Sequence, residues 1–150
     1  MKILFINLFL VCMVPIGLNF QSMDLEYMRL NYEKAFDNKE LCRSMMESLT
    51  LKKDEPIYLA YLSGLQTLWA NHTINPIAKF GTFEKGRMNL EKAVEMDPNN
   101  LEIRFIRLSV QKNAPRFLGY YNNIETDEEF IAQHQHNISS ASLLRLISKL

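Results

Sequence analysis

Glycine, proline and cysteine are all scarce in this chain. It has five glycines, five prolines and two cysteines among its 150 residues. Because glycine and proline supply the turns of a β-sandwich, their scarcity beside many Leu, Met, Lys and Glu residues favours an all-α fold. A chain of this length is expected to form one domain with a substantial buried core.

Cys42 is the only cysteine beyond residue 22. If the first 22 residues are removed, no intramolecular disulfide can form, and packing must stabilise the rest of the chain. A reactive thiol is one interpretation of Cys42. We favour the other, a small buried hydrophobe near Leu41 and Met45.

The chain also lacks a surplus of either charge, since 17 Lys and Arg residues balance 17 Asp and Glu residues. Removing residues 1–22 takes away only Lys2, which leaves 16 basic residues against 17 acidic ones. Nucleic-acid binding needs an excess of cations to neutralise phosphates. We therefore expect no nucleic-acid partner.

The sequence contains none of the common catalytic motifs: no G-x-S-x-G, no H-E-x-x-H and no phosphate-binding glycine loop. On a helix, His134 and His136 point about 200° apart, so they cannot share an ion. The acidic residues between 125 and 129 are expected at a helix N-terminus, where negative charge is favourable. We expect no enzyme activity, no cofactor and no metal site.

Residues 1–22 have the layout of a secretory signal peptide. Lys2 supplies the positive end, residues 3–14 are almost continuously apolar, and Pro15 and Gly17 break the helix. The alternative is an uncleaved N-terminal anchor, although the apolar run is short for a span of about 20 residues. We predict an exported protein, periplasmic or secreted, with one helical domain over residues 23–150. A membrane contact is expected only through the N-terminal segment, if it is uncleaved.

Apolar residues recur at helical spacing along the rest of the chain, which predicts about six to seven helices arranged as antiparallel hairpins. The expected helices span 24–37, 39–51, 56–70, 76–96, 101–111, 127–136 and 141–149. Phe36 is expected on the buried face of the first helix. Ser63 and Thr67 are expected on the polar face of the third.

Two further expectations concern the C-terminal helices. Thr126 and Glu129 are spaced as a capping box, in which each side chain satisfies a free N–H group at the start of a helix. Leu143, Leu144 and Ile147 are expected to form the apolar side of the last helix.

The stretch from Phe83 to Val110 has the best-defined local pattern. The residues that share one face of its first helix are Phe83, Gly86, Leu90, Ala93 and Val94. A glycine in this buried stripe indicates close approach by a neighbouring helix. Pro98 is expected to end the helix at Met96, and Asn100 is expected to cap the next one.

The helix expected at 101–111 has two apolar faces. Leu101, Phe105 and Leu108 form one face, and Ile103, Ile106 and Val110 form the other. Narrow polar strips separate the two faces. A helix of this kind is sandwiched between neighbours, so we predict that it lies at the centre of the fold.

The segment GRMNLEKAVEMDPNN resembles the second helix and exit turn of a tetratricopeptide repeat. Gly86, Leu90, Ala93 and Pro98 match the offsets at which that family places small, bulky, small and proline residues. The resemblance covers one helix and one turn, since Gly64 in YLSGLQTLW lies about ten residues further upstream than the repeat allows. The run DPNNLEIRFIRLSVQKNAPRFLGY is similar to exported bacterial helical proteins without an assigned activity. These resemblances imply a repeat-like helical architecture and export.

We favour a protein–protein interaction module, because repeat-like hairpins present a grooved face to a protein or peptide partner. The candidate partner-binding residues are Arg104, Arg107 and Gln111, as a strip that holds a carboxylate, with Tyr58, Tyr61 and Trp69 as aromatic contacts. If both arginines are fully paired and covered, this groove has no anchor. The alternatives are a structural subunit of an envelope assembly and an exported ligand-binding protein or enzyme, which would need a deep polar pocket.

Overall fold

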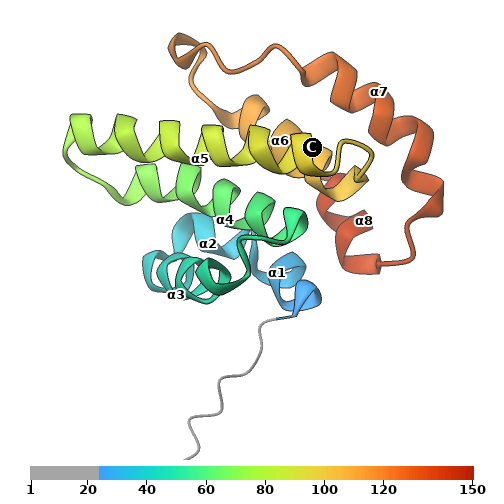
Figure 1. The fold of residues 1–150 in the computed structure, drawn as a ribbon, viewed down its shortest axis with the longest axis horizontal. Helices are drawn as coiled ribbons and strands as arrows, with labels where there is room; N and C mark the ends of the chain where they lie inside the picture. The colour runs from blue at the N-terminus through green and yellow to red at the C-terminus, as the bar shows by residue number, and fades with distance from the viewer. Residues whose placement is uncertain (1–23) are drawn as a thin grey trace, which may run out of the picture.

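The computed structural model describes residues 24–150, which form eight α-helices and no β-strand (Figure 1). The all-α fold expected from the sequence is therefore confirmed, and the predicted leader, residues 1–22, lies outside the described residues. The helices are α1 Leu25–Asn31, α2 Lys34–Asp37, α3 Lys39–Leu49, α4 Pro56–Trp69, α5 Pro76–Met96, α6 Leu101–Asn113, α7 Ile124–His134 and α8 Ala141–Ile147. Within residues 24–150, no helix combines the length and apolarity that a membrane span requires.

The predicted helix over 24–37 is divided in two, which explains why there is one helix more than expected. α1 ends at Asn31 and α2 begins at Lys34, with Tyr32 between them. The buried Tyr32 ring lies edge-on to Tyr61 of α4, with 5.5 Å between the ring centroids. Phe36, expected on the buried face, is half exposed, and its neighbour Ala35 is buried instead.

α4 packs against α3, α5 and α6 and is buried on nearly all sides (Figure 1). Ser63 and Thr67 are buried, so the polar outer face expected for this helix was wrong. Their hydroxyls donate to the carbonyl oxygens of Leu59 and Gly64 in the same helix, at 2.6 and 2.7 Å. Because these hydroxyls bond within their own helix, both residues can face another helix without water.

The buried side of α5 is the predicted one: Phe83, Gly86, Leu90, Ala93 and Val94 are all buried. A Cβ atom added at Gly86 would lie 2.8 Å from the carbonyl oxygen of Ser63 and 2.9 Å from the backbone nitrogen of Thr67. The predicted close approach is confirmed, and the neighbour is α4, which runs beside α5 in Figure 1.

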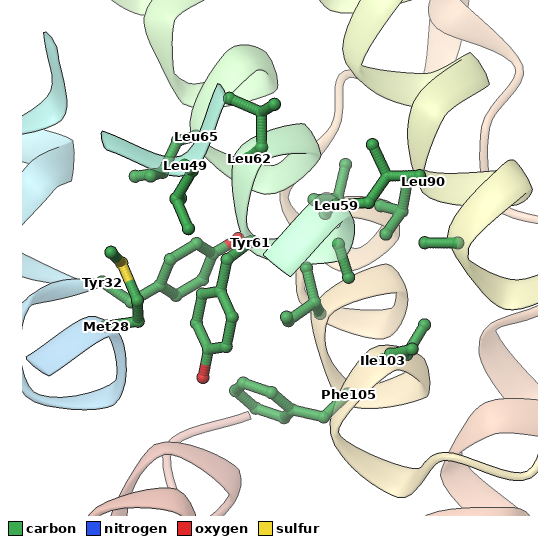
Figure 2. Packing of buried hydrophobic residues seen from close by; sticks show 14 of the residues in the cluster. Met28, Tyr32, Leu49, Leu59, Tyr61, Leu62, Leu65, Leu90, Ile103 and Phe105 are labelled. Carbon is green, nitrogen blue, oxygen red and sulfur yellow. The ribbon is translucent and has the colours of Figure 1, made fainter. Parts of the chain in front are cut away.

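α6 occupies the centre of the fold, as its two apolar faces predicted, and it packs against α4, α5 and α7. Figure 2 shows Ile103 and Phe105 extending from α6 into the core that also contains Tyr61 and Leu90. The predicted cap is also confirmed. The side-chain oxygen of Asn100 accepts from the N–H groups of the second and third residues of α6, at 3.1 and 3.2 Å.

The two C-terminal helices differ from the expectation. α7 begins at Ile124, so Thr126 and Glu129 lie inside the helix and the predicted capping box was wrong. In α8, Leu146 is buried together with Leu143, whereas Leu144 is exposed. The apolar side of α8 is therefore rotated relative to the prediction.

Candidate functional site: two buried ion-pair clusters and an apolar cleft

Arg107, the centre of the predicted carboxylate-binding strip, is buried and fully paired. Its Nε and Nη2 atoms donate to the two carboxylate oxygens of Asp127, at 2.7 and 2.8 Å. Its Nη1 atom donates to Glu91 Oε2 at 3.0 Å. Burial alone lowers the pKa of Arg107, but the two carboxylates outweigh it and raise the pKa above its ordinary value. Asp127 has no exposed surface, so its place in α7 is structural and not simply a favourable charge at a helix end.

The other two members of the strip also face α7. Arg104 donates from Nη1 to Asp127 Oδ1 at 3.0 Å, and its guanidinium lies 4.4 Å from the ring centroid of Phe130. Gln111 is buried, and its amide nitrogen donates to Asn123 Oδ1 at 3.2 Å. Neither arginine is free to hold a partner's carboxylate, so the proposed arginine groove has no anchor.

Tyr61 belongs to a second buried cluster, which ties α1 to α6 through α4. Its hydroxyl donates to Glu102 Oε1 at 2.5 Å, and Arg29 donates to both oxygens of the same carboxylate, at 2.8 and 2.6 Å. Burial raises the pKa of Tyr61, and the charge of Glu102 adds to the increase. This tyrosine holds the fold together and presents no surface to a partner.

The remaining aromatic candidates are half buried and lie apart from each other. Tyr58 sits near the start of α4 with the Lys52 ammonium 4.3 Å from its ring centroid. Trp69 ends α4, and Lys39 and Arg43 lie over its ring at 5.5 and 5.4 Å. Eleven helical steps place the two positions roughly 16 Å apart along the axis of α4. The six residues predicted from the sequence therefore do not form one binding surface.

A surface that the sequence analysis did not predict is an apolar cleft with a volume of about 310 Å³. It lies where the end of α4, the start of α5, the end of α6 and the turn after α6 meet. Its apolar walls include Leu68, Phe80, Phe83, Val110, Phe117 and Leu118. Two rings stand at its surface, since Phe80 is 55% exposed and Phe117 is 86% exposed. Large aromatic side chains grouped at a recess are typical of an interaction surface.

The charge around this apolar cleft has one sign. The segments that frame it, 56–83 and 103–124, contain no Asp or Glu. Lys79 lines the cleft, and Arg116 lies on the same turn as Phe117, with its guanidinium 5.2 Å from the ring centroid of Tyr121. Within residues 24–150, neither cation has a carboxylate partner. The absence of acidic residues from both segments is a sequence signal that could have located the cleft.

Other reactive groups do not assemble into a site. Cys42 is buried, as expected, with its thiol 3.6 Å from the carbonyl oxygen of Leu65. His134 stacks on Phe130, and residues 24–150 contain no group of three His, Cys, Asp or Glu side chains placed to hold a metal ion. Comparisons with protein-family models, curated proteins and solved structures found no match.

Proposed function

We propose that this chain is an exported protein–protein interaction domain, without catalytic activity, that binds a partner protein through the apolar cleft. The observation that carries the proposal is the exposure of Phe80 and Phe117 at the edge of a recess with apolar walls. The proposal also keeps the tetratricopeptide-repeat-like arrangement, because the hairpin of α4 and α5, closely packed at Gly86, forms one wall of the cleft.

The two exposed rings are large enough to anchor a complex. Covering their accessible parts would remove roughly 250 Å² of apolar surface from water, since each ring presents about 150–250 Å² when fully exposed. At about 25 cal/mol per Å² this gives roughly 6 kcal/mol before the cost of association. Two aromatic anchors of this kind are typical of the few residues that dominate a protein interface.

A small-ligand site is a weaker interpretation of the same recess. Ligand pockets usually enclose most of the ligand, and their volumes range from about 300 to 1,000 Å³. The apolar cleft has a volume at the lower end of that range, and the ring of Phe117 lies largely outside it. An open recess with protruding rings is better suited to contact with a partner protein than to enclosing a small ligand. A structural role in an envelope assembly would use the same contact, with a permanent partner.

Site-specific photocrosslinking in the native host tests this proposal. A photoreactive phenylalanine analogue is placed at Phe117, at Phe80 or, as a control, at Leu51, which is 78% exposed and lies outside the cleft. We expect a discrete crosslinked protein from both cleft positions and none from position 51. Crosslinking that is absent from all three positions, or equal at all three, would overturn the proposal. Mass spectrometry of the mature N-terminus tests export separately.

A further inference from the structure

A second recess of about 360 Å³ adjoins the apolar cleft. Leu68, Val110 and Asn113 line both. The second recess lies between α2, the end of α6 and the C-terminal residues, and Phe36 forms part of its wall. Three exposed aromatic residues therefore line the two adjoining recesses, Phe80 and Phe117 the first and Phe36 the second. We refer to the two recesses together as the double groove.

The two ends of the double groove carry opposite charge. Lys79 lines the first end, and Arg116 lies on the adjacent turn; within residues 24–150, neither has a carboxylate partner. Three charged residues line the second end, but Glu33 accepts from Lys149 at 2.5 Å and also lies 3.5 Å from the Arg145 guanidinium, so its charge is neutralised. Asp37 remains, and within residues 24–150 it has no basic partner. Among the described residues, the double groove therefore has an unpaired cation at one end, apolar walls in the middle and one unpaired carboxylate, Asp37, at the other end.

The shape and charge of the double groove favour one of three possible occupants. A second copy of the chain would bring one concave face to another, and neither would fill the other. An anionic membrane surface would be attracted to Lys79 but repelled by Asp37, and its flat surface would not enter the recesses. A segment of a partner protein can place apolar side chains in both recesses and one charge at each end, as amphipathic helices do in apolar grooves.

Building on the proposed function, we propose that the double groove binds an amphipathic segment of the partner. Its apolar side chains contact Leu68, Phe80 and Phe117. A carboxylate of the segment lies against Lys79, and a cation lies against Asp37. The apolar contacts provide most of the affinity, and the two charges fix the direction in which the segment lies.

Selection from a display library of random peptides, each about 16 residues or four helical turns long, tests this inference on the purified full-length chain. We expect enriched peptides with apolar residues at helical spacing, an acidic residue at one end and a basic residue at the other. K79E and D37K should each weaken such a peptide roughly fivefold, the scale of an exposed ion pair. K85E is the matched control, since Lys85 is exposed on the same helix, outside the double groove, and should leave affinity unchanged.

The F117Q variant separates failure of this inference from failure of the proposed function. If F117Q abolishes binding while K79E and D37K bind normally, the charge assignment is overturned and the apolar cleft remains a binding surface. If the selected peptides bind F117Q as well as they bind the unsubstituted chain, both proposals are wrong. Enrichment of no peptide, together with binding to phosphatidylglycerol vesicles, would overturn both in favour of a membrane surface.

Discussion

The contact between α4 and α5 makes a sharp prediction for Gly86→Ala. An added Cβ atom would lie 2.7 Å from Thr67 Cγ2, 2.8 Å from the Ser63 carbonyl oxygen and 2.9 Å from the Thr67 nitrogen. Two of these three atoms belong to the backbone of α4, so rotation of a side chain cannot relieve the overlap. The two helices would have to move apart along their shared core.

The expected loss follows from two opposing effects. Alanine has a higher helix propensity than glycine by about 1 kcal/mol. Overpacking a well-packed core costs about 1–3 kcal/mol, and backbone overlap belongs at the upper end of this range. The substitution should therefore lower the free energy of unfolding by roughly 2 kcal/mol. Urea denaturation followed by far-ultraviolet circular dichroism measures this change directly.

Gly81→Ala is the matched control, because Gly81 lies on the same helix and no atom lies within 4 Å of its added Cβ. At position 81 only the helix propensity changes, so the free energy of unfolding should rise by up to about 1 kcal/mol. Opposite signs for the two glycines support the packing of α4 on α5. Stabilisation by both substitutions would refute the close approach at Gly86.

Three further predictions concern buried polar groups. Asp127→Asn leaves Arg107 underpaired in the core and should cost about 3 kcal/mol in urea denaturation; a loss below about 1 kcal/mol would mean that the pair is not buried. Tyr61→Phe keeps the ring but leaves Glu102 without its hydroxyl donor, for an expected loss of roughly 1.5–3 kcal/mol by the same assay. Burial raises the pKa of the Cys42 thiol to about 11. As pH rises, the thiol ionises at a lower pH in the unfolded chain than in the folded one. The free energy of unfolding should therefore be constant below about pH 8 and fall toward pH 11. Urea titrations of Cys42→Ala should show a smaller fall between pH 8 and 10, and an unchanged fall would contradict the assignment.

The features that the sequence predicted well are set by residues near one another in the chain. The buried stripe of α5 follows from helical spacing, and the end of that helix follows from Pro98. The cap at Asn100 depends only on the next three residues. The centre of the fold was predictable for a related reason, since two apolar faces on α6 require a neighbour on each side.

The errors arise where distant parts of the chain decide the outcome. Asp127 looked like a favourable charge at a helix end, but it pairs with Arg107, 20 residues away. Ser63 and Thr67 looked solvent-facing because helical spacing does not reveal that a hydroxyl can bond within its own helix. The same limit explains why the arginines of the predicted carboxylate-binding strip turned out to be paired. An unpaired arginine and a buried, paired one have the same local sequence pattern.

The apolar cleft was missed because its walls come from segments far apart in the chain. Phe80 and Phe117 are separated by 36 intervening positions, and neither belongs to the buried face of a helix. Helical spacing predicts which residues are buried, but it does not show which exposed residues gather. Only the acid-free composition of the two framing segments pointed toward this end of the molecule.

Phe117 and its neighbours form the proposed partner-binding surface. The most direct test compares the affinities of F117Q and L51Q for the partner identified by photocrosslinking. Both positions are highly exposed, so glutamine removes no core packing at either. We predict that F117Q weakens binding about 30-fold or more, as expected for an interface anchor, and that L51Q binds like the unsubstituted chain. Equal affinity of the two variants would contradict the claim.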